Sequence, residues 1–79
     1  MIEDYIITDI LKEFKAIKDV HNIRSRGYSD YIFLDMHIKV DSSLNVDEAH
    51  TLVHEIETKL NNKLNKKVDL IIHVEPNII

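Results

Sequence analysis

Two segments of the chain alternate strictly between apolar and polar residues, which is typical of β-strands with one buried face. They span Tyr31–Val40 and Val68–Glu75. Their apolar positions are Ile32, Leu34, Met36, Ile38 and Val40 in the first, and Val68, Leu70, Ile72 and Val74 in the second. A third segment, Asp19–Arg26, predicts another strand. Its apolar residues Val20 and Ile23 have mismatched parity, which indicates a bulge or twist.

Two further segments show the apolar spacing of amphipathic helices. The first is Met1–Lys18, with apolar residues Ile2, Ile6, Ile7, Ile10, Leu11, Phe14 and Ile17. The second follows Asn45, where Asn45 and Glu48 have the spacing of an N-terminal capping box. It is expected to end near Asn61–Asn65. Its predicted apolar stripe consists of Val46, Ala49, Val53, Ile56 and Leu60.

The order helix–strand–strand–helix–strand predicts an α+β fold, a two-layer sandwich with both helices on one face of a three-stranded sheet. Gly27–Asp30 provides a hairpin turn and Asp41–Asn45 a loop. Pro76 is expected to end the last strand, because proline cannot donate a ladder hydrogen bond. The helical connection favours a right-handed crossover, which sets the last strand parallel to another. With 79 residues, we expect a single domain, 1–79.

The composition argues against several classes of function. The net charge of −4 speaks against nucleic-acid binding and favours cations near the surface. The absence of cysteine excludes disulfides and thiolate metal ligands. The apolar runs fall far short of the roughly 20 residues that span a bilayer. A catalytic triad, a thiol nucleophile and a glycine-rich phosphate loop are all lacking, so we expect no enzymatic activity.

The histidines are the main candidates for chemistry. Strand alternation places His73 and Glu75 on one polar face, and His37 on the polar face of its own strand. An imidazole beside a carboxylate, with a further imidazole nearby, offers suitable ligands for a divalent metal. Each residue also has an ordinary explanation. His21 can hydrogen-bond a turn, and a lone histidine such as His37 is usually solvated.

A second histidine pair, His50 and His54, is spaced four residues apart in the predicted second helix. Residues at this spacing are neighbours on one flank of a helix, so the pair can chelate a metal. The same spacing is common on exposed helix surfaces, and Glu57 beside the pair suits both interpretations.

Four segments, taken in order, resemble the C-terminal cytoplasmic domain of cation diffusion facilitator transporters. They are Val20–Arg26, Phe33–Ile38, Val46–His50 and Ile72–Pro76, within a similarity that extends from about residue 10 to residue 76. The resemblance implies a metallochaperone-like, ferredoxin-like fold that forms a homodimer beneath a transmembrane zinc/proton antiporter. It also implies a place at the cytoplasmic face of the cell membrane and a regulatory metal near the dimer interface.

Matched residue by residue, the resemblance implies the metal ligands His21, His37, His73 and Glu75, with His50 close to the same site. His54 matches no such family position. Ligands of this kind suit Zn²⁺, and also Co²⁺, Ni²⁺, Mn²⁺ or Fe²⁺. The chain departs from the family at Ser29, where a glycine is often found, which predicts a different hairpin turn.

The leading prediction is a metal-sensing, homodimerising domain of a zinc or other divalent-cation efflux transporter. The membrane-spanning part is expected upstream of this sequence, and the chain alone is expected to be soluble. Homodimerisation is also favoured by Tyr31, Phe33 and Ile71, apolar residues on the otherwise polar sheet face. One alternative is a free-standing metal carrier of the metallochaperone type. Another is a module that senses small organic molecules, against which the scarcity of glycine in the turns counts.

Overall fold

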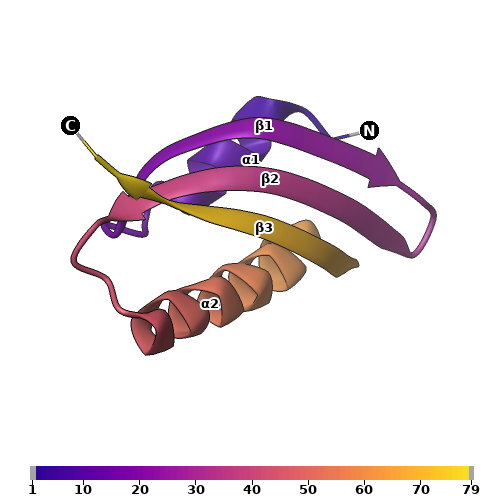
Figure 1. Ribbon diagram of the computed structural model, residues 1–79. Coiled ribbons are helices and arrows are strands. Elements are labelled where there is room, and N and C mark those ends of the chain that lie inside the picture. Colours follow the sequence, from indigo (N-terminus) through magenta and orange to yellow (C-terminus); the bar gives the residue numbers. More distant parts are fainter. Residues whose placement is uncertain (1, 79) are drawn as a thin grey trace.

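The computed structural model describes residues 2–78 and contains five elements in the predicted order. These are α1 (Asp4–Leu11), β1 (Ile17–Gly27), β2 (Tyr31–Asp41), α2 (Val46–Leu64) and β3 (Lys67–Asn77). The strands form one sheet in the order β1-β2-β3, with β2 antiparallel to β1 and parallel to β3. Both helices cover the same face of the sheet and leave the other face open (Figure 1). The predicted two-layer α+β sandwich is therefore confirmed.

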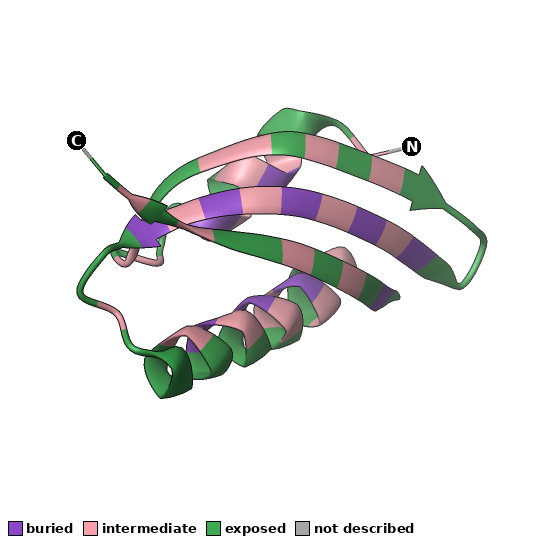
Figure 2. Cartoon of the chain, viewed as in Figure 1, coloured by how far each residue is buried: buried purple, intermediate pink, exposed green. Residues whose placement is uncertain are grey.

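The core lies between the helices and the central strand β2. The five aliphatic residues of β2, at every second position, are buried and alternate with partly exposed ones (Figure 2). They pack with Ile7 and Leu11 of α1, with Val68 of β3, and with Leu52, Ile56 and Leu60 of α2. Because one face of β2 is filled in this way, every polar residue between these positions must lie on the open face.

The predicted first helix, 1–18, was too long. In the structure α1 ends at Leu11, and Ile17 already belongs to β1, paired with Val40. Two turn hydrogen bonds connect these elements, from the Phe14 N–H to the Leu11 carbonyl and from the Ile17 N–H to the Phe14 carbonyl. Phe14 and Ile17 lie beyond the end of the helix but still pack against the core. For this reason the apolar spacing of the helix continues past its last residue. Met1 lies outside the described residues.

The predicted start of α2 is confirmed, and its predicted apolar stripe was partly wrong. The Asn45 side chain accepts a hydrogen bond from the Glu48 N–H at 2.8 Å, and the Glu48 carboxylate accepts one from the Asn45 N–H at 3.0 Å. Together these form the capping box. Leu52 is buried, whereas Val46 is 83% exposed. The first turn of α2 stands clear of the sheet (Figure 2), so a side chain there has no core to enter.

The edge strand β1 is irregular, and the edge strand β3 is longer than predicted. In β1 the register shifts between His21 and Arg24, where Asn22 has a φ of 52°, so the predicted irregularity is confirmed. β3 continues beyond its predicted end, because Pro76 remains in register with Val40. A proline is tolerated on an edge strand, where one side of the backbone has no ladder partner. Within residues 2–78, no helix has the length and apolarity needed to cross a bilayer.

Candidate metal centre

A row of three histidines crosses the open face of the sheet. The strand register places His21 opposite His37, and His37 opposite His73. The ring centroids of His21 and His37 are 5.3 Å apart, and those of His37 and His73 are 4.4 Å apart with nearly parallel planes. Each of the three strands therefore contributes one imidazole to the same level of the sheet.

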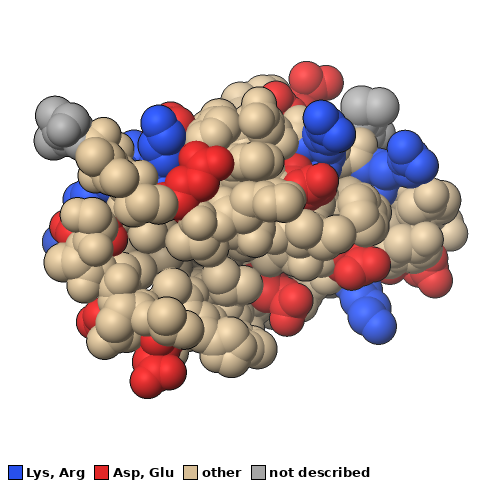
Figure 3. Space-filling model, viewed as in Figure 1, with Lys and Arg blue, Asp and Glu red and all other residues tan. Residues whose placement is uncertain are grey.

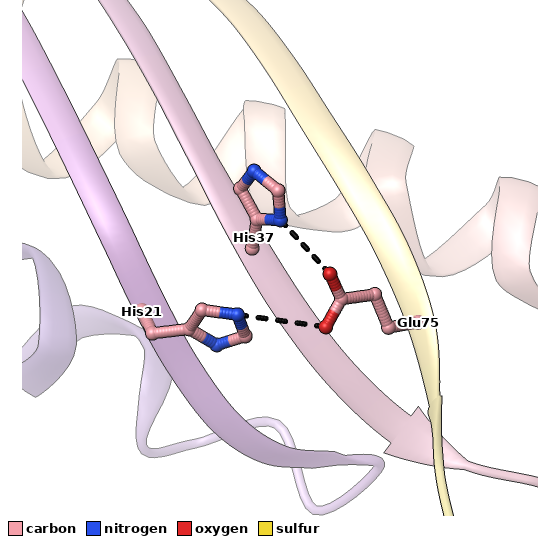
Figure 4. A group of neighbouring side chains, drawn as sticks. All are labelled: His21, His37 and Glu75. Carbon is pink, nitrogen blue, oxygen red and sulfur yellow. Dashed lines mark hydrogen bonds and ion pairs between the residues drawn. The ribbon is translucent and has the colours of Figure 1, made fainter.

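Glu75 connects two of these imidazoles. Its Oε2 accepts a hydrogen bond from Nδ1 of His37 at 2.9 Å, and its Oε1 lies 3.5 Å from Nε2 of His21 (Figure 4). One potential ligand atom from each of the three residues lies within 4.8 Å of the others. The three side chains come from three different strands, so the sheet register fixes their relative positions. We refer to His21, His37 and Glu75 as the sheet cluster.

The sheet cluster has the ligand types of a divalent transition-metal site. Around a tetrahedral ion with bonds of about 2.0–2.2 Å, ligand atoms lie about 3.3–3.6 Å apart. Small side-chain rotations are therefore enough to bring the three groups onto one ion. Three protein ligands also leave one position for water or for a ligand from another molecule.

Electrostatics keeps the Glu75 carboxylate in the form that binds cations. Its pKa is lowered, chiefly by the hydrogen bond from His37, although partial burial acts in the opposite direction. The nearby charges of His21, His37 and Lys39 lower this pKa further. On the face of the molecule seen in Figure 3, acidic and basic side chains are interspersed.

Asp19 orients His21, and sequence reasoning missed it. Its Oδ2 accepts a hydrogen bond from Nδ1 of His21 at 3.0 Å. A proton held on Nδ1 leaves the lone pair on Nε2, the nitrogen that faces Glu75. The signal was present in the Asp19–Val20–His21 spacing, because residues two apart on a strand share a face.

His73 lies on the predicted face of the sheet, but it is not one of the three residues of the sheet cluster. It shares the open face with Glu75, as strand alternation requires. However, Glu75 turns toward His37 and His21, while Nε2 of His73 lies 3.6 Å from Oδ1 of Asp35. The His73 side chain is 53% exposed and stacks on the ring of His37. The structure therefore places His73 beside the sheet cluster rather than within it.

His50 lies on α2, in the layer that covers the opposite face of the sheet (Figure 1). Its Nε2 faces Nε2 of His54 at 3.2 Å. The sheet therefore separates His50 from the sheet cluster of the same chain. Its predicted contribution to that site would have to come from another copy of the protein.

Comparison with solved structures supports the fold. The metal-bound C-terminal domain of the CzcD transporter from Thermotoga maritima matches with a TM-score of 0.79 and 31% sequence identity, covering 89% of this chain and 81% of that one. The cytosolic domain of a cation diffusion facilitator family protein matches with a TM-score of 0.80 and 28% identity, covering 92% and 87% of the two chains.

Comparison with curated proteins gives the same family. The manganese efflux system protein MneP of Bacillus subtilis (strain 168) is 24% identical over 83 residues, covering 96% of this chain and 28% of that protein. The cation-efflux pump FieF of Serratia proteamaculans (strain 568) is 27% identical over 74 residues, covering 94% and 24%. This chain thus spans about a quarter of the length of these relatives. The family described as "Cation efflux protein, cytoplasmic domain" matches residues 2–77. The resemblance seen in four sequence segments is confirmed, and the chain belongs to the family of cytoplasmic domains of cation efflux proteins.

Proposed function

We propose that this chain is the metal-sensing, homodimerising cytoplasmic domain of a divalent-cation efflux transporter, and that residues 1–79 form this single domain. The sheet cluster carries the proposal, because two imidazoles and a carboxylate from three strands converge on the open face. Membership in the cation efflux family supports it. The membrane-spanning part of such a transporter would belong to sequence beyond this chain.

Metal binding would regulate transport by favouring one arrangement of two copies. A ligand shifts an equilibrium only through its different affinity for the two states. The three ligands of one sheet cluster leave a coordination position open. If a second copy supplies the missing ligand, the ion favours the arrangement in which that ligand is within reach. The attached membrane helices would then respond to the metal.

The open sheet face is the surface we propose for the homodimer. Beyond the histidine row it carries Tyr31 and Ile71, which are 37% and 45% exposed, and the partly buried Phe33. Arg24 and Asp35 lie on the same face and add charges of both signs. Apolar side chains surrounded by charged residues are typical of protein–protein interfaces.

We propose Zn²⁺ as the preferred ion. Imidazole and carboxylate ligands, with a position left open, agree with Zn²⁺ coordination. The same ligand set accepts Mn²⁺, Co²⁺ and Fe²⁺, and one relative of this chain is named as a manganese efflux protein. Competition between these ions for one site is therefore part of the test.

Calorimetric titration of the metal-free chain with Zn²⁺, Mn²⁺ and Co²⁺ tests the site. We expect Zn²⁺ to bind most tightly, and Glu75→Gln and His37→Ala to weaken that binding strongly. Asp69→Asn removes a carboxylate from the same face outside the cluster, and it should bind like the parent. Unchanged Zn²⁺ affinity in both cluster variants would show that the site lies elsewhere.

Sedimentation measurements with and without Zn²⁺ test the homodimer. We expect a dimer at micromolar protein concentration, with an altered shape or stability when metal is bound. Phe33→Asp should weaken the dimer, because it places a charge within the proposed apolar contact. A chain that remains monomeric under all conditions would refute this part of the proposal.

A further inference from the structure

The exposed flank of α2 carries a second group of metal-ligand side chains. Nε2 of His50 and Nε2 of His54 face each other at 3.2 Å, and the two rings are nearly perpendicular, with centroids 4.5 Å apart. Both residues are exposed to solvent. The spacing of four residues places them on successive turns of the same helix flank.

The separation of the two nitrogens suits joint coordination of one ion. Two imidazole nitrogens bound at about 2.0–2.1 Å with an angle of about 90–109° lie about 2.8–3.4 Å apart. The observed 3.2 Å falls within this range, so the pair could bind without any movement of the helix backbone. A hydrogen bond between two neutral rings has a similar length, but on an exposed surface it competes with water and contributes little to stability.

We propose that His50 and His54 form a second divalent-metal site, distinct from the sheet cluster. We expect this site to bind ions that prefer imidazole ligands, such as Zn²⁺, Ni²⁺ and Cu²⁺. Asp47 and Glu57 lie three residues before and after the pair, on the same flank, and their negative charges favour a cation there. With two protein ligands and water in the remaining positions, this site should bind more weakly than the sheet cluster.

This assignment differs from the role that the family resemblance implies for His50. The resemblance places His50 near the sheet site and gives His54 no role. In the structure α2 covers the opposite face of the sheet (Figure 1), and the His50 ring is directed at His54. Metal could therefore occupy the helix pair and the sheet cluster of one chain independently.

Zn²⁺ titration of a chain without a working sheet cluster tests the helix site. In the double variant His37→Ala/Glu75→Gln, we expect one weaker Zn²⁺-binding step to remain. Adding either His50→Gln or His54→Gln should abolish that step to the same extent. The ring resonances of His50 and His54 should also shift together in NMR spectra as Zn²⁺ is added. Circular dichroism checks that each variant keeps its helix.

Two matched variants test the spacing itself, both starting from His50→Gln in the same background. Thr58→His restores a partner four residues from His54, and should restore Zn²⁺ binding. Asn62→His restores the number of histidines, but about 12 Å along the helix from His54, and should not restore binding. Both positions are exposed, and neither substitution removes a charge.

The outcomes separate this site from the proposed sheet site. If His54→Gln leaves the remaining step intact while His50→Gln abolishes it, His50 binds with other partners and the helix pair is refuted. Absence of any remaining step in the double variant also refutes the pair. If the sheet cluster does not bind metal, the unmodified chain should still show the helix step, because His50 and His54 lie outside that cluster.

Discussion

Nδ1 of His37 donates a hydrogen bond to Oε2 of Glu75 over 2.9 Å, although the two residues are not opposite each other in the sheet. The parallel register places His37 beside His73, and Glu75 beside Lys39. The Glu75 side chain is long enough to reach diagonally to His37 and on to His21. The orientation of this one side chain therefore determines which two histidines of the row share a carboxylate.

This geometry predicts that Glu75 and His73 contribute unequally to stabilisation by metal. At a hundredfold excess over its dissociation constant, an ion that binds only the folded chain stabilises it by about 2.7 kcal/mol. We expect Glu75→Gln to lose most of the stabilisation that Zn²⁺ gives by binding to the sheet cluster. His73→Gln should keep most of this stabilisation. Urea unfolding with and without Zn²⁺ measures both. Equal losses would mean that His73 rotates into the site when metal binds.

Asp19→Asn should weaken Zn²⁺ binding without removing a ligand. The Asp19 carboxylate accepts the Nδ1 proton of His21, which leaves Nε2 free to coordinate. Loss of such a supporting partner typically reduces metal affinity by about 10–100-fold. Calorimetry measures the change, with Asp30→Asn in the exposed hairpin as the matched control. Parent-like affinity in Asp19→Asn would mean that His21 is oriented by other contacts or is not a ligand.

The sequence predicted the parts of the fold that depend on local patterns. Alternation over ten residues in β2 determines which side chains are buried, and the Asn45–Glu48 spacing defines the start of α2. The end of α1 was not predictable in this way. Phe14 and Ile17 contact the core from a turn and from a strand, and their spacing also fits a helix. The pairing of Ile17 with Val40 shows that Ile17 belongs to a strand and not to the helix. Because these two residues are far apart in the sequence, a local pattern does not reveal their contact.

The same distinction applies to the candidate site. Strand alternation correctly placed His37, His73 and Glu75 on one face of the sheet. The position of His21 opposite His37 depends on the register of β1, which shifts just after His21. Glu75 contacts His37 and His21 rather than His73 because of the orientation of its side chain. The periodicity of the sequence does not predict this orientation.

The core also makes a quantitative prediction about two residues that sequence reasoning treated alike. Ile56 is fully buried between α2 and the sheet, whereas Val46 is largely exposed in the first turn. Ile56→Ala should destabilise the chain by about 2–5 kcal/mol, because it removes buried methyl groups and leaves a cavity. Val46→Ala should change stability by less than about 0.5 kcal/mol. Chemical unfolding of the metal-free variants measures both, and similar effects would contradict the observed packing of α2.

Glu75 should also affect the acid stability of the metal-free chain. Its pKa is lower in the folded chain, chiefly because of the hydrogen bond from His37. A carboxyl of this kind stabilises the fold above its unfolded pKa of about 4.3, and the stabilisation is lost as the pH falls through the lower folded value. Glu75→Gln should therefore reduce the dependence of unfolding free energy on pH below about 4.3. Asp69→Asn controls for the loss of a negative charge, and the same reduction there would exclude a specific role for Glu75.

As the pH is lowered, Zn²⁺ binding should weaken before the stabilisation by the Glu75 carboxylate is lost. Imidazole coordinates only in its neutral form, so affinity should fall as the pH decreases through about 6.5, the usual histidine pKa. If the ion instead sits on surface carboxylates such as Asp41, Asp47 and Glu48, affinity should hold until about two pH units lower. Titrations at about pH 7.5 and about pH 5.5, either side of the histidine value, separate these cases. A steep loss in the parent, together with weaker binding by His37→Ala at the higher pH, supports histidine ligands. Near-equal affinity at the two pH values would exclude them.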